Sequence, residues 1–157
     1  MITIHSYSNS YSNSKASSHS PGENKHSRDR VLYQSLTPAQ FAAVIRSGWR
    51  QFSADSAEQK FFYPKCRLAY AEMIARMFNV AHYSAAYVVQ FRLPLCFLQR
   101  YQIQSIAYEE HQEYRIPTAD LAAMNQHIIE RIEVVSAFWQ EGETHAHNLV
   151  AELACAS

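Results

Sequence analysis

Apolar residues recur at regular spacing from Val31 onward, and few precede it. Short runs rich in Val, Tyr and Phe are typical of β-strands, whereas apolar residues that return every three or four positions are typical of amphipathic helices. On this basis we predict short strands over residues 31–33, 49–52, 61–63, 85–93, 101–106, 112–116 and 132–138. We predict helices that begin at Thr37, Arg67 and Thr118.

The first helix has the clearest start and end signals. Thr37 is suited to the N-cap, Pro38 to the first turn and Gln40 to the third helical position, where its side chain can complete a capping box. Gly48 follows the last apolar position and is suited to the left-handed residue that ends many helices.

The order of these elements predicts the fold class. Most of the strands follow one another late in the chain instead of alternating strictly with helices. This order favours an α+β fold over a doubly wound parallel sheet. We therefore predict one compact domain over residues 31–139, with six or seven short, mostly antiparallel strands and three helices.

The two ends of the chain differ from this domain in composition. Residues 1–30 contain nine serines and little apolar surface, which predicts a disordered arm. Residues 140–157 carry Glu141, Glu143 and Glu152 but neither Lys nor Arg, which predicts an acidic tail. We expect removal of residues 1–30 to change the melting temperature by only a few degrees.

Composition excludes several classes of function. The chain has 157 residues with 14 Lys and Arg against 14 Asp and Glu, so a general nucleic-acid or membrane-surface binder is not expected. Its apolar runs are too short to cross a membrane. Three widely spaced cysteines predict a reducing compartment, and we expect a cytoplasmic protein. The three glycines form no phosphate-binding loop, which excludes that way of holding a nucleotide.

The densest polar cluster is the run Glu109-Glu110-His111-Gln112-Glu113. If a strand extends back through this run, Glu109, His111 and Glu113 share one face and their carboxylates raise one another's pKa. Such a strand could carry proton transfer or stabilise a positive, sugar-like centre. The alternative is a solvated hairpin tip with no chemical role.

Aromatic residues form the second candidate cluster. They are Tyr33, Phe61, Phe62, Tyr63, Tyr70 and Tyr83. Core packing explains any one of them, but together they could form a stacking surface for a flat ring such as nicotinamide or a base.

Three segments carry a resemblance to a known family: SGWRQF, FFYP, and EHQEYRIPTADLAAMNQHI. Through them residues 31–139 resemble a family of small bacterial proteins labelled "ADP-ribosylation/crystallin". The order of elements is similar to a minimal ADP-ribosyltransferase fold. The resemblance implies NAD as substrate and a nucleotide or a protein acceptor as partner, and the short apolar runs already argue against a membrane.

The resemblance also implies roles for individual residues. Glu113 would hold the ribose hydroxyl and stabilise an oxocarbenium ion, and His111 or Gln112 would orient the acceptor. The residues implied in binding NAD are Tyr33, Gln34, Phe62, Tyr63 and Tyr70. These roles predict NAD-dependent ADP-ribosyl transfer or NAD hydrolysis.

The sequence departs from the family pattern at the dinucleotide anchor. Gln34 stands where Arg or His is expected, and a neutral amide cannot pair with phosphate as a guanidinium does. The alternative is therefore a catalytically degenerate module that binds a nucleotide or a protein. A third reading is a nuclease that uses His111 with Glu109 or Glu113 as an acid–base pair.

Overall fold

The computed structural model describes residues 28–140, in which six strands form two small antiparallel sheets. The long sheet has the order β1-β3-β6 and contains β1 (Asp29–Leu36), β3 (Ala85–Pro94) and β6 (Ile129–Trp139). The short sheet has the order β2-β5-β4 and contains β2 (Phe61–Phe62), β5 (Gln112–Pro117) and β4 (Gln102–Ser105). The predicted α+β class is confirmed.

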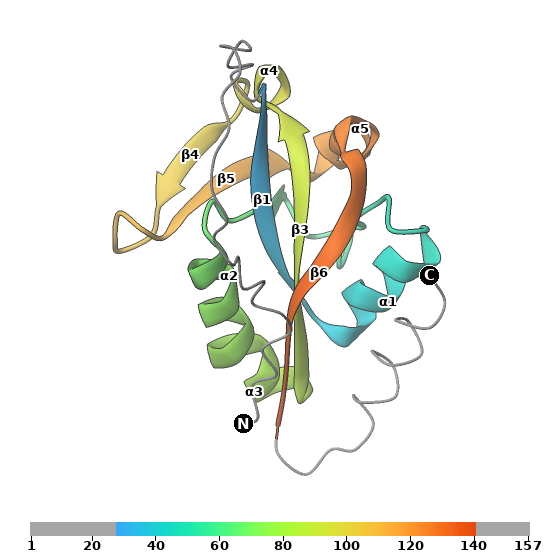
Figure 1. The fold of residues 1–157 in the computed structure, drawn as a ribbon, viewed down its shortest axis with the longest axis vertical. Coiled ribbons are helices and arrows are strands. Elements are labelled where there is room, and N and C mark those ends of the chain that lie inside the picture. The colour runs from blue at the N-terminus through green and yellow to red at the C-terminus, as the bar shows by residue number, and fades with distance from the viewer. Residues whose placement is uncertain (1–27, 141–157) are drawn as a thin grey trace, which may run out of the picture.

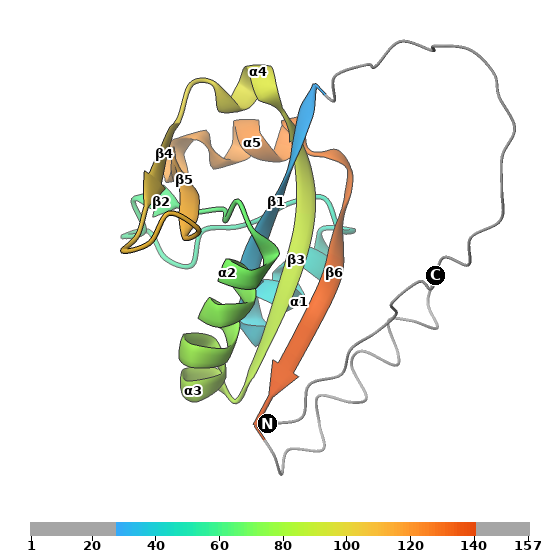
Figure 2. The same cartoon turned by 60° about the vertical axis from the view of Figure 1, so that its left-hand side comes forward.

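Helices cover both faces of the long sheet (Figures 1 and 2). One face carries a continuous helical segment made of α2 (Leu68–Ile74), a π-helical turn η1 (Ala75–Asn79) and α3 (Val80–Tyr83). The other face carries α1 (Pro38–Arg46). The remaining helical pieces, near the other end of the long strands, are α4 (Leu95–Leu98), the 3-10 turn η2 (Thr118–Asp120) and α5 (Leu121–His127).

The start of α1 confirms the predicted capping box. The Gln40 backbone N–H donates to Thr37 Oγ1 (3.3 Å), and the Thr37 backbone N–H donates to Gln40 Oε1 (2.7 Å). Gly48 follows the helix with φ 71°, a left-handed conformation that glycine adopts without steric cost.

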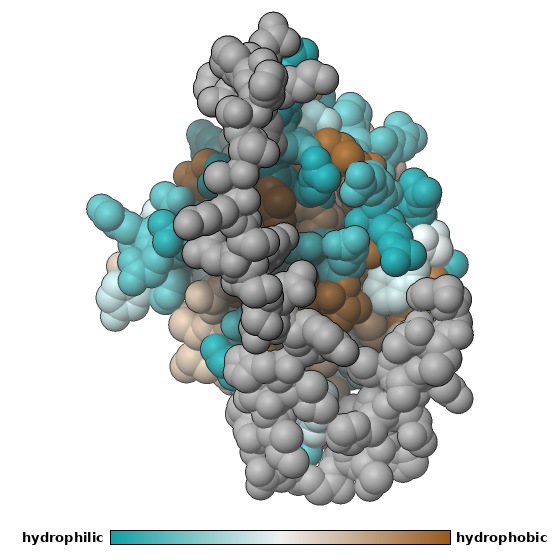
Figure 3. Space-filling model, in the orientation of Figure 1, coloured by the Kyte–Doolittle hydropathy of each residue, from teal (hydrophilic) through white to brown (hydrophobic). Residues whose placement is uncertain are grey.

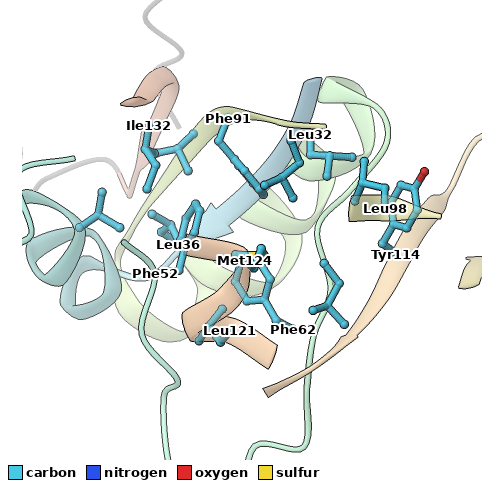
Figure 4. Packing of buried hydrophobic residues seen from close by; sticks show 14 of the residues in the cluster. Leu32, Leu36, Phe52, Phe62, Phe91, Leu98, Tyr114, Leu121, Met124 and Ile132 are labelled. Carbon is cyan, nitrogen blue, oxygen red and sulfur yellow. The ribbon is translucent and has the colours of Figure 1, made fainter. Parts of the chain in front are cut away.

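Alternation along β1 divides the interior into two cores. Leu32 and Leu36 point into the main core, where they meet Phe91 of β3 and Met124 of α5 (Figure 4). Tyr33 points the other way and packs against the second core beneath α2, η1 and α3. Successive residues of β1 therefore face different surroundings.

The short segment 64–66 joins the two sheets. On one side the Tyr33 N–H donates to the Lys65 carbonyl (2.9 Å) and the Lys65 N–H donates to the Tyr33 carbonyl (2.7 Å). On the other side the Cys66 N–H donates to the Gln112 carbonyl (2.8 Å) and the Tyr114 N–H donates to the Pro64 carbonyl (2.9 Å). Segment 64–66 therefore acts as a bridge of one strand's width between β1 and β5.

The structure corrects the predicted strand at residues 49–52. Trp49 has φ 65°, and its carbonyl accepts from the Ile132 N–H. The Phe52 N–H and carbonyl both bond to the side-chain amide of Asn125 (2.9 and 2.8 Å). Because tertiary partners occupy these backbone groups, the segment does not form a strand.

Several predicted boundaries also move. β1 starts at Asp29 and β6 covers Ile129–Trp139, so both strands are longer than predicted. The helix predicted to begin at Arg67 has its first residue at Leu68 and passes into the π-helical turn at Ala75. The predicted arm up to residue 27 and the tail from residue 141 lie outside the described residues. Within residues 28–140, no helix has the length and apolarity needed to cross a membrane.

The position of Asp29 leads to a test with two truncations. Asp29 pairs with Arg92 of β3, and the Arg28 carbonyl accepts the Leu95 N–H (2.8 Å). Removal of residues 1–27 should leave the melting temperature within a few degrees. The expectation that residues 1–30 can be removed at little cost is therefore corrected, because their removal deletes the start of β1 and should lower the melting temperature further, by about 4–8 °C for each kcal/mol lost. Equal melting curves for the two truncated proteins would show that residues 28–30 contribute nothing to stability.

Candidate functional site

The predicted polar cluster is split between a turn and a strand. Glu109 and Glu110 lie in an exposed turn, and β5 starts only at Gln112. The His111 carbonyl accepts the Ile106 N–H (3.0 Å), which closes this turn. The strand therefore does not extend back to Glu109, so the condition for a shared face of Glu109 and Glu113 is not met, and Glu113 is the cluster's buried carboxylate.

Glu113 is 6% exposed and is held by three side chains. Lys65 Nζ lies 2.9 Å from Oε2, and Gln104 Nε2 donates to Oε1 (2.8 Å). The Tyr70 hydroxyl lies 3.5 Å from Oε2, at the limit of a hydrogen bond. Lys65 Nζ also donates to the Tyr63 carbonyl (2.6 Å). The carboxylate is thus enclosed and its charge is balanced by Lys65.

Burial and this ion pair shift the pKa values of the neighbouring groups. Burial lowers the pKa of the Lys65 ammonium, and the negative charge of Glu113 opposes that shift. Burial, followed by the charge of Glu113, raises the pKa of Tyr70 to about 12. At neutral pH, Tyr70 therefore remains a neutral phenol that can donate a hydrogen bond.

Register places several predicted site residues on one face. Tyr33 is opposite Lys65, Lys65 is opposite Glu113, and Glu113 is opposite Gln104. Directly opposed residues share a face, so these four side chains form a row across both sheets.

Tyr70, which contacts Glu113 in this row of side chains, also stacks on His111. The His111 ring stacks on Tyr70, with ring centroids 4.6 Å apart and an interplanar angle of 10°. The structure therefore brings Tyr33, Tyr70 and His111 to the same side as Glu113.

The other predicted residues lie elsewhere. Gln34 follows Tyr33 in β1 and so points to the opposite face, and Phe62 is buried in the main core against Phe52 (5.1 Å between ring centroids). Gln112 is the neighbour of Glu113 in β5 and likewise points away from it. The residues implied in NAD binding are therefore divided between two faces, because adjacent strand residues alternate.

A cavity of about 90 Å³ lies on the Gln34 side. Gln34, Phe52, Phe62, Tyr63 and Lys65 contribute to its wall, together with Leu36, Gln40, Val44, Ser53, Asp55 and Gln59. Gln34 Oε1 is fully buried, and it has no hydrogen-bond partner among residues 28–140. The cavity therefore has an acceptor without a donor.

Two residues of this region were missed by the sequence analysis. Lys65 is the lone charge in the apolar run from Phe61 to Cys66, which is a visible signal for a buried cation. Gln104 gives no such signal, because its role depends on its register with Glu113.

Metal-binding clusters and comparisons with known proteins give no further information on the function of this site. In the described part of the chain, no group of three or more His, Cys, Asp or Glu side chains is placed to hold a metal ion. No protein-family model matches the sequence, and neither a curated protein nor a solved structure shows significant similarity to it.

We predict that mutations of Lys65 and Glu113 have strongly non-additive effects on the free energy of unfolding, because the two side chains form a buried ion pair. Lys65→Met should destabilise the domain by about 3–5 kcal/mol, since it leaves a buried carboxylate without its counter-charge. The double variant Lys65→Met/Glu113→Leu should recover most of that loss. Urea unfolding of both single variants and the double variant measures the coupling, and additive losses would contradict the interpretation.

Proposed function

We propose that this domain is a binding module, and that its ligand places a hydrogen-bond donor on Gln34 Oε1 inside the cavity. The observation that supports this proposal is that Gln34 Oε1 is buried without a hydrogen-bond partner among residues 28–140, in a residue of the cavity wall. An unsatisfied buried polar group costs about 1–3 kcal/mol, a cost that a bound donor removes.

The other cavity amides already have partners. Gln40 Oε1 accepts from the Thr37 backbone, and its Nε2 donates to Asp55. Gln59 accepts from the Asp55 N–H (2.7 Å) and donates to the Phe61 carbonyl (3.0 Å). The wall is therefore held in shape by its own hydrogen bonds, whereas the buried Gln34 oxygen has no partner among residues 28–140.

The size and lining of the cavity favour one planar end group. A volume of about 90 Å³ is below the roughly 300 Å³ at which drug-sized ligand pockets begin. Phe52, Phe62 and Tyr63 supply aromatic wall, which suits a flat ring that carries an amide or amine donor. The resemblance to ADP-ribosyltransferases supports the nicotinamide or adenine end of a nucleotide as that group.

The engagement of Glu113 supports binding without turnover. A carboxylate that must stabilise an oxocarbenium ion has to reach the sugar, whereas Glu113 is buried and bonded to Lys65 and Gln104. Gln34 and Glu113 also lie on opposite faces of the strand layer, so one ligand end group does not contact both.

Replacement of the unpaired acceptor should separate stability from binding. Gln34→Met keeps the size of the side chain but removes the acceptor, so it should raise the unfolding free energy by about 1 kcal/mol. The same variant should lose binding of nicotinamide or adenosine, measured by NMR titration. Gln90→Met is the matched control, because Gln90 is also a half-buried strand glutamine but donates to Glu133 (2.9 Å). Unchanged binding in Gln34→Met would contradict the proposal.

NAD-dependent ADP-ribosyl transfer or NAD hydrolysis is the second candidate. It is favoured by the gathering of Tyr33, Tyr70 and His111 on the Glu113 face. In that mechanism Glu113 would exchange its contact with Lys65 for the ribose hydroxyl.

An assay with labelled NAD distinguishes the two candidates. A binding module should release no nicotinamide from NAD, whereas an enzyme should release it. In an enzyme, Glu113→Gln should lower the rate of nicotinamide release by about 100-fold or more, as when one stabilising contact to a transition state is removed. Glu109→Gln is the matched control, since Glu109 is exposed in the adjoining turn. Circular dichroism shows whether Glu113→Gln is still folded. Turnover that survives Glu113→Gln would exclude this carboxylate from the chemistry.

A further inference from the structure

Strand β4 has one side without a neighbouring strand. It pairs with β5 through Gln102–Ser105, and in the described residues it stands at the end of the order β2-β5-β4. The backbone groups on its outer side therefore point away from the sheet. Such an edge is a template on which another extended segment can pair.

The β4 edge is short, at four residues, but it lacks the charges, prolines and bulges that also block such pairing. Residues 102–106 contain neither a charge nor a proline. The edge strand β6 of the long sheet differs, because it carries Glu130, Arg131 and Glu133 and its register with β3 shifts twice. Charges and bulges discourage edge-to-edge association, so β6 is protected and β4 is open.

Exposed apolar side chains accompany this open edge. Ile103 is 44% exposed, Ile106 43% and Tyr108 63%. The β4–β5 hairpin stands out from the body of the domain at the left of Figures 1 and 2, and Figure 3 shows the same projection on the surface. A partner can therefore approach the outer side of β4 without meeting the helices.

We propose that β4 pairs antiparallel with β4 of a second copy of this chain, which joins two short sheets across a two-fold axis. The charges that flank the strand favour a second copy as the occupant. Arg100 precedes β4, and Glu109 and Glu110 follow it in the exposed turn. Antiparallel pairing brings the start of one β4 beside the end of the other, so Arg100 of each copy lies toward the acidic turn of the other.

The same pairing covers the exposed apolar residue of the strand. Ile103 is opposite Tyr114 on the main-core face of β5, and a neighbouring strand on its outer side buries more of its surface. Gln104 alternates to the Glu113 face, so the second strand also shields the outer end of the Lys65–Glu113 row. A two-fold contact of this kind is closed and stops at a dimer.

Analytical ultracentrifugation of the full chain over a wide concentration range tests the proposal. The wild type should sediment as a dimer that dissociates on dilution. Ile103→Lys should weaken the dimer by about tenfold or more, since it brings a charge from each copy into the joined pair of strands, where the two repel. Val134→Lys is the matched control, because Val134 is similarly exposed (38%) but lies on the protected edge strand β6. It should leave the dimer unchanged.

A charge exchange tests the orientation and does not depend on Ile103→Lys being folded. Arg100→Glu and Glu110→Arg, both at exposed positions, should each weaken the dimer, and the double variant should restore it. A wild type that is monomeric at every concentration would overturn the proposal. A dimer that Ile103→Lys and both charge reversals leave intact would overturn it as well, and so would open-ended association.

Discussion

Segment 64–66 joins two sheets that have only three strands each, and the buried ion pair between Lys65 and Glu113 lies at this junction. Backbone hydrogen bonds join segment 64–66 to β1 and to β5, but these are few. The side-chain pair adds a charge-assisted contact at 2.9 Å where the two sheets meet. Burying both charges costs free energy, and the additional hydrogen bonds from Gln104 and to the Tyr63 carbonyl offset that cost.

This structural role limits what the polar cluster can do chemically. Glu113 is the residue that an ADP-ribosyltransferase mechanism needs, yet its removal from Lys65 for catalysis would leave a buried cation unpaired. Gln34 presents the opposite situation, since its side-chain oxygen is buried without a partner among residues 28–140 and the residue belongs to the wall of a cavity. The two faces of β1 thus separate a cluster whose polar groups have partners from a buried acceptor that has none among residues 28–140.

Local signals predicted most of the fold. Thr37, Gln40 and Gly48 set the ends of α1 through interactions within a few residues, and the structure has them as expected. The high content of Val, Tyr and Phe in residues 85–93 likewise identified β3, the central strand of the long sheet. The strand predicted at residues 49–52 is wrong because the Phe52 backbone bonds to the side chain of Asn125, a residue distant in sequence that local signals do not reveal.

The sequence by itself determined the α+β class, the main helix and strand positions, and which polar residues were candidates for a site. Only the tertiary structure decided which of those candidates meet. A change of one residue reverses the face of a strand side chain, so Tyr33 joins Glu113 while Gln34 points to the cavity. The register between segment 64–66 and β5 likewise decides that Lys65 is the partner of Glu113. Pairing between residues far apart in the chain leaves no periodic signal in the sequence.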